Sequence, residues 1–104
     1  MAFMHVPVPE YKELTDNFEM GLRMEDSCTA AVNDGFFDAF KNNGGTHMFA
    51  GHDHLNNFIT EYDGVKMCYY TKSSYNCNFT FKELGGLLIT LDQNNNVNLE
   101  IKEF

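Results

Sequence analysis

The sequence is poor in basic residues. It carries 7 Lys and Arg against 15 Asp and Glu, a formal net charge of −8 at pH 7. Nucleic acids and anionic membrane surfaces both demand a basic protein surface. We therefore expect neither nucleic acid nor a membrane as a partner. The acidic balance is compatible with holding divalent cations, although a solvated acidic surface accounts for most of these carboxylates.

Cysteine motifs and long apolar runs are also lacking. Cys28, Cys68 and Cys77 show no Cys-x-x-Cys spacing, so they predict neither a disulfide framework nor a zinc ribbon. No apolar run reaches transmembrane length, and residues 1–5 lack the basic leader and apolar core of a signal peptide. By default we expect a reduced, cytoplasmic compartment for the chain as given, with secretion left open if a signal lies upstream.

The sequence does contain enough apolar residues for a packed core. Hydrophobic residues make up 43% of the chain, with ten Phe and five Tyr among its 104 residues. This content is well above that of a disordered chain. The length allows one domain at most, or part of one.

The first third of the chain predicts little regular structure. A strand is expected from Ala2, and Pro7 ends it because proline removes a ladder donor, which leaves His5 at the strand's C-terminal tip. Pro9 is favoured at a first helical position and predicts a short helix there. Residues 16–31 have no clear period, and we expect a long loop.

A clear helix signal follows. Asn33 can cap the N-terminus of the helix, and the Asn-Asn-Gly-Gly sequence at 42–45 supplies a left-handed stop. The spacing between them is typical of a helix packed on a sheet. The predicted buried stripe consists of Val32, Phe36, Phe37 and Phe40.

The remaining residues predict strands. A short buried strand is expected over 46–50, and two antiparallel hairpins follow it. The sequence therefore predicts an α+β fold with one helix-strand unit followed by two hairpins. The hairpins comprise strands 57–62 and 65–70 around Asp63-Gly64, then strands 86–91 and 97–104 around 92–96, with a polar, irregular segment at 71–83 between them.

Histidines gather beyond the tips of two predicted strands. In extended backbone, side chains two positions apart share a side, so His52 and His54 can point into one pocket. If strands 2–6 and 46–50 are parallel neighbours, His5 joins them at the same sheet edge. Neutral imidazole is a common ligand for zinc, iron, nickel and copper. The alternative is that these are solvated loop histidines.

Two segments carry a family resemblance. The sequences HVPVPEY at 5–11 and FAGHDHLNNF at 49–58, with GFFDAF between them, resemble the C-terminal half of the calcineurin-like metallophosphoesterases. The branch related to purple acid phosphatases is the most similar. The resemblance implies that residues 1–104 form the C-terminal half of a four-layer αββα sandwich domain, with no second domain.

The resemblance also implies a dinuclear metal centre that hydrolyses phosphate esters. His5 and His52 would coordinate one metal and His54 the other, the metals being Fe, Mn or Zn. The substrate would be a phosphorylated small molecule or a phosphoprotein. Of the other residues, Asp53 and Asn56 would shape the loop, and His47 would be an ordinary packed histidine.

Several motifs of the family are not in this sequence. The family also uses Asp-x-His, Gly-Asp and Gly-Asn-His/Asp motifs, which supply a bridging aspartate, an asparagine ligand and often a catalytic histidine. Without the bridging carboxylate, repulsion between two cations is uncompensated, because neutral imidazoles carry no charge. We therefore expect this chain alone to hold at most one metal, weakly, and to have little or no phosphatase activity.

Two further functions stay open. The chain could be a non-catalytic metal- or partner-binding module, or a mononuclear zinc enzyme built on His5, His52 and His54. Half of a sandwich domain would also leave the inner face of its sheet uncovered by the missing N-terminal half. We therefore expect the isolated chain to self-associate.

Overall fold

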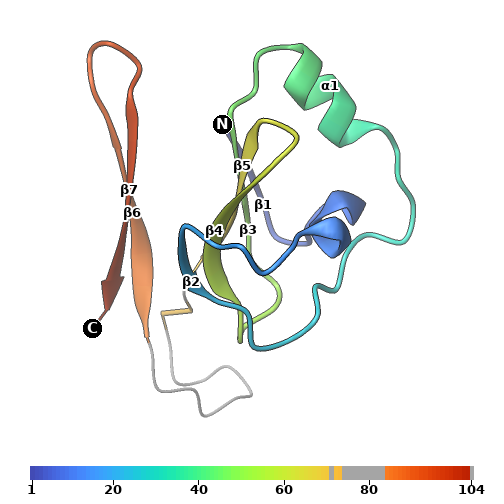
Figure 1. The fold of residues 1–104 in the computed structure, drawn as a ribbon, viewed down its shortest axis with the longest axis horizontal. Coiled ribbons are helices and arrows are strands. Elements are labelled where there is room, and N and C mark those ends of the chain that lie inside the picture. Colours follow the sequence, from blue (N-terminus) through green and yellow to red (C-terminus); the bar gives the residue numbers. More distant parts are fainter. Residues whose placement is uncertain (71, 74–83, 104) are drawn as a thin grey trace.

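The computed structural model describes residues 1–70, 72–73 and 84–103, and its elements confirm an α+β fold (Figure 1). The strand at Ala2, the short helix at Pro9, the helix before residue 42 and both hairpins are present as predicted. In chain order the elements are β1 (Ala2–Met4), the 3₁₀ helix η1 (Pro9–Glu13), β2 (Met20–Leu22), α1 (Phe36–Asn42), β3 (His47–Ala50), β4 (Asn57–Tyr62), β5 (Val65–Tyr69), β6 (Gly85–Leu91) and β7 (Val97–Glu103).

The larger sheet has five strands in the order β1-β3-β5-β4-β2. β1 and β5 both run parallel to β3, whereas β4 is antiparallel to β5 and to β2. Phe3 pairs with Phe49, so the ends of β1 and β3 lie at the same sheet edge. The expected parallel pairing is therefore confirmed, and α1 lies in the crossover between the two strands.

One face of this sheet carries most of the core. The centre of the core is Tyr11 of η1, which is fully buried and whose hydroxyl donates to backbone carbonyls of β3 and β5. Phe37 joins the same core from α1. Other core residues on this face are Leu14, Met48, Ala50, Phe58, Val65, Met67 and Tyr69.

The opposite face is covered by the second hairpin. Phe49, Ile59 and Cys68 are buried there. Partly buried side chains of β6 and β7 pack against them, among them Leu87, Ile89 and Leu99. Figure 1 shows the resulting arrangement, with the helical segments on one side of the five-stranded sheet and the hairpin on the other.

The loop predicted for residues 16–31 is wrong at one point, because it contains β2. This strand pairs with the edge of β4 and is too short for an alternating pattern to be recognised. Its middle residue is Gly21, where a Cβ atom would lie 1.9 Å from the carbonyl oxygen of Asn57. Glycine therefore allows the close approach of the two backbones.

The predicted start and buried stripe of the helix are also wrong in part. The N-cap position of α1 is Gly35, and the side chain of Asn33, two residues earlier, accepts a hydrogen bond from Gly35 N at 3.0 Å. Val32 is 73% exposed and Phe36 is 44% exposed, whereas Phe37 of the same predicted stripe is buried and Phe40 packs partly buried against the core. A helix this short turns only one narrow stripe to the core.

Parts of the sequence predictions lie outside the described residues. These are most of the irregular segment at 71–83 and the last residue of the final strand. Among the described residues, no helix has the length and apolar character needed to cross a membrane.

The Tyr11 hydroxyl offers a test of the core. It lies 3.1 Å from the Met48 carbonyl oxygen and 3.0 Å from that of Cys68. Tyr11→Phe leaves these buried acceptors without that donor, and we expect it to lower the free energy of unfolding by about 1–3 kcal/mol. The measurement is urea unfolding followed by circular dichroism.

The matched control is Tyr62→Phe, which removes an exposed hydroxyl bonded to Glu13. We expect this change to stay within about 0.5 kcal/mol of the parent chain. Equal effects of the two substitutions would contradict the role assigned to Tyr11.

Candidate functional site

Two of the predicted histidines meet at the C-terminal ends of the parallel strands β1 and β3. His5 follows β1 and His52 follows β3, and Gly51 N donates to the His5 carbonyl oxygen at 3.1 Å across the parallel pair. The side-chain atoms His5 Nε2 and His52 Nδ1 lie 3.3 Å apart, and the two rings are nearly perpendicular. Both side chains are exposed, so a solute can reach the pair.

The backbone at His52 departs from a strand. Its φ angle is +70°, in the left-handed region that non-glycine residues seldom adopt. The same-side argument for His52 and His54 assumed extended backbone, which is not present at this point. In the described residues, His5, His52 and His54 do not form a group whose ligand atoms all lie within 4.8 Å. The ligand role of His54 therefore stays a prediction.

Asp53 shapes the loop, as expected from the sequence. Its side chain is only 4% exposed, and its two oxygens accept from Cys28 N at 3.1 and 3.2 Å. The Tyr69 hydroxyl donates to the same carboxylate at 2.5 Å. Burial, and then this hydrogen bond, raises the pKa of Tyr69, so its hydroxyl keeps its proton. The oxygens of Asp53 are therefore engaged inside the protein.

Asn56 and Glu25 also connect the segment 24–28 to the histidine loop. The Asn56 side-chain oxygen accepts from Met24 N at 3.0 Å and from Glu25 N at 3.1 Å. In return, a Glu25 side-chain oxygen accepts from Leu55 N at 2.9 Å. The segment 24–28 is thus held along the histidine loop by reciprocal hydrogen bonds, and the expected loop-shaping role of Asn56 is confirmed.

Cys28 is a site residue that the sequence patterns did not indicate. Among the described residues, Cys28, His52 and Asp53 form the group whose potential ligand atoms all lie within 4.8 Å of one another. The Cys28 side chain is exposed and forms no disulfide. Its only sequence signal was a cysteine in an irregular segment, which has no recognisable metal-binding spacing.

The histidine pair fits one metal ion. Ligand nitrogens about 2.0–2.1 Å from a tetrahedral zinc ion lie about 3.3–3.4 Å from one another. His5 Nε2 and His52 Nδ1 have this separation. The carboxylate that the described residues bring to this group is Asp53, and its oxygens already accept hydrogen bonds, so Asp53 is not free to bridge two metals.

The fourth histidine, His47, lies on the sheet face that the hairpin covers in part. Its Nδ1 lies 2.8 Å from the Thr46 hydroxyl, and its ring stacks beside Phe49. Partial burial, and then the charge of Lys66, lowers the pKa of His47. This agrees with the expectation of a packed histidine.

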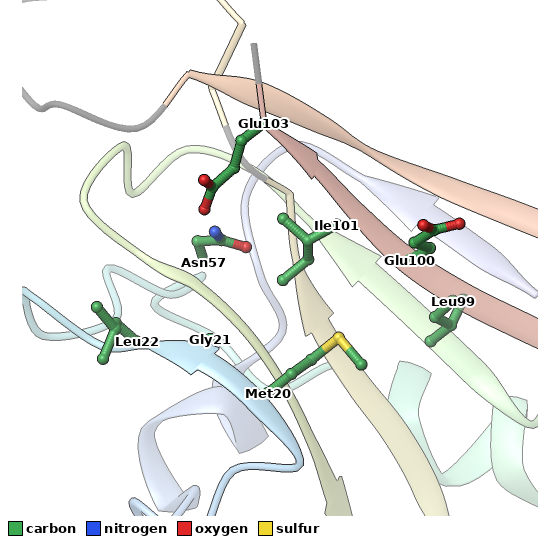
Figure 2. Close-up of a pocket in the computed structure, with 8 residues that line it drawn as sticks. All are labelled: Met20, Gly21, Leu22, Asn57, Leu99, Glu100, Ile101 and Glu103. Carbon is green, nitrogen blue, oxygen red and sulfur yellow. The ribbon is translucent and has the colours of Figure 1, made fainter.

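A separate cavity of about 500 Å³ lies between the β2–β4 edge and β7 (Figure 2). Apolar side chains of β2 and β7 line it, and Glu103 and Asn57 stand at one end. None of its lining residues is a histidine or a cysteine. Its lining is mainly apolar, with the carboxylates of Glu100 and Glu103 beside the apolar side chains.

Three curated proteins of Arabidopsis thaliana are similar to this chain. Probable inactive purple acid phosphatase 14 is 35% identical over 77 residues, which are 72% of this chain and 19% of that protein. Probable inactive purple acid phosphatases 29 and 28 are 37% and 34% identical over 71 and 70 residues, each covering 66% of this chain and 18% of the relative.

The matches have a limited extent. The chain spans about a fifth of the length of these curated relatives. No protein-family model matches the chain, and no solved structure matches it. Within these limits, the sequence similarity shows that the chain is distantly related to the purple acid phosphatase family.

Proposed function

We propose that this chain is part of a non-catalytic relative of the purple acid phosphatases, a module that keeps the phosphoesterase fold to bind a metal ion or a partner. The main support is Asp53, the carboxylate beside the histidine pair, whose oxygens are already bonded to Cys28 N and the Tyr69 hydroxyl. The names of all three relatives contain "probable inactive".

Electrostatics favour one cation over two at this edge. Two divalent ions about 4 Å apart repel by roughly 17 kcal/mol at an effective dielectric constant of about 20. The imidazoles of His5 and His52 bring no charge to offset this repulsion. A single cation between the two nitrogens meets no such barrier, so we assign one weakly held ion to the chain alone.

The second candidate is a working phosphoesterase in a longer protein. It is favoured by the 3.3 Å approach of His5 Nε2 to His52 Nδ1, which suits metal ligation. Residues 1–104 would then be the C-terminal half of the four-layer domain, with His54 on a second metal. Iron, manganese or zinc would supply the hydrolytic chemistry, and a phosphorylated small molecule or phosphoprotein would be the substrate.

The first test is hydrolysis of p-nitrophenyl phosphate by the 104-residue chain with added zinc, manganese or iron. We expect no turnover above that of the metal in buffer, because no free carboxylate compensates a second cation. His52→Ala is expected to show the same lack of turnover. Turnover that disappears in His52→Ala but survives in His47→Ala would favour the phosphoesterase instead.

The second test is zinc binding, measured by equilibrium dialysis and elemental analysis. We expect at most one ion per chain, with His5→Ala and His52→Ala each weakening binding at least about tenfold, since loss of even outer-shell groups costs that much. His47→Ala is the matched control and should bind like the parent chain. Equal binding by all four proteins would remove the histidine pair from the site.

We also propose that the cavity between β2 and β7 is an apolar contact surface for the missing half of the domain. β2 is an edge strand, and its Met20 and Leu22 are 38% and 53% exposed. Leu99 and Ile101 of β7 line the opposite wall (Figure 2). Unpaired strand edges beside apolar side chains favour association with another chain.

In the isolated chain, this surface should drive self-association. We expect size-exclusion chromatography with light scattering to show a mass that rises with concentration, and Leu22→Ser to reduce it. Leu88→Ser is the control, because Leu88 is similarly exposed at 47% but does not line the cavity. A monodisperse monomer at all concentrations would count against the proposal.

A further inference from the structure

The cavity between β2 and β7 is apolar along its walls and charged at one end (Figure 2). Leu99, Ile101 and Glu103 alternate along β7, and alternate residues of a strand project to the same side. Glu103 therefore continues the apolar row of β7 and ends it with a carboxylate. Asn57, at the start of β4, lines the same end of the cavity.

Two acceptors at this end have no partner within residues 1–70, 72–73 and 84–103. The Glu103 carboxylate forms no ion pair or hydrogen bond there, and the side-chain oxygen of Asn57 is buried without one. Glu100, on the same strand, pairs instead with Lys102 at 2.6 Å. No Lys or Arg lines the cavity, so the charge of Glu103 is uncompensated.

A partner that covers this cavity has to meet two requirements. Exposed apolar side chains such as Met20 and Leu22 favour contact with other apolar groups. The same contact removes the Glu103 carboxylate from water, which is strongly unfavourable unless a cation and hydrogen bonds replace the lost hydration. The partner must therefore bring apolar groups and a positive charge together.

The walls indicate the shape of such a partner. Met20 and Leu22 are two positions apart on β2, as Leu99 and Ile101 are on β7, so both walls repeat at the spacing of a strand. Alternate side chains of an extended peptide have the same spacing. Recognition of an extended segment by pockets for its alternate side chains is a common mode of peptide binding.

We propose that the cavity binds an extended peptide segment of a partner chain, with apolar side chains between β2 and β7 and one basic side chain at Glu103 and Asn57. Arginine suits this end better than lysine, because its planar guanidinium has five N–H donors and can bond the carboxylate and the amide oxygen together. This inference rests on the proposed contact surface and adds the chemistry of the segment that fills it.

The test uses random dodecapeptides displayed on phage, selected on the immobilised 104-residue chain. Peptides that also bind Leu22→Ser are discarded, which leaves those that depend on the cavity. We expect the remaining peptides to share apolar residues at alternate positions and an arginine or lysine. Selection on Glu103→Gln should lose the basic residue from this pattern, because the amide that replaces the carboxylate carries no charge.

The affinity of a selected peptide gives a quantitative check. With a labelled synthetic copy, fluorescence anisotropy should show binding at least about tenfold weaker to Glu103→Gln, the effect of losing a hydrogen bond to a charged group. Glu100→Gln is the matched control, because it removes the same charge from the same strand but from a carboxylate already paired with Lys102. We expect its affinity to stay within about twofold of the parent chain.

The outcomes separate this inference from the contact surface on which it rests. Circular dichroism of each variant checks that the fold is retained. Selected peptides without a basic residue, or equal weakening by Glu103→Gln and Glu100→Gln, overturn the charged contact and leave the apolar contact surface in place. A selection that yields no peptide dependent on Leu22 overturns both.

Discussion

The buried carboxylate of Asp53 joins three segments of the chain. It follows β3 in sequence and accepts hydrogen bonds from the backbone N–H of Cys28, in a distant loop, and from the hydroxyl of Tyr69 on β5. Hydrogen bonds to a charged group contribute about 1.5–3 kcal/mol each, so this single side chain is a main source of order at the sheet edge. The same bonds engage its oxygens inside the protein.

Backbone geometry places the side chains of His5 and His52 next to each other. Parallel pairing of β1 with β3 brings His5 beside His52, and the bond from Gly51 N to the His5 carbonyl oxygen continues that pairing beyond the strand ends. The left-handed φ of His52 then directs its ring toward His5. Strained backbone of this kind persists where the surroundings hold it, often at functional sites.

The similarity to purple acid phosphatases and the geometry of the site both support the proposed non-catalytic role. The relatives are named probable inactive, and this chain covers about a fifth of their length. In the chain itself, the histidine pair at 3.3 Å lies beside a carboxylate whose oxygens already accept hydrogen bonds, which is the geometry on which the proposed binding role rests.

The sequence by itself determined the α+β class, the hairpins and the approach of His5 to His52, because turn residues, proline and parallel strand tips act locally or through simple topology. It did not reveal β2, the exposure of Phe36 or the place of Cys28. Those depend on contacts between distant segments: the Gly21 backbone against Asn57, the short helix against the core, and Cys28 N against Asp53. Only the tertiary structure brings such partners together, because no local period in the sequence encodes them.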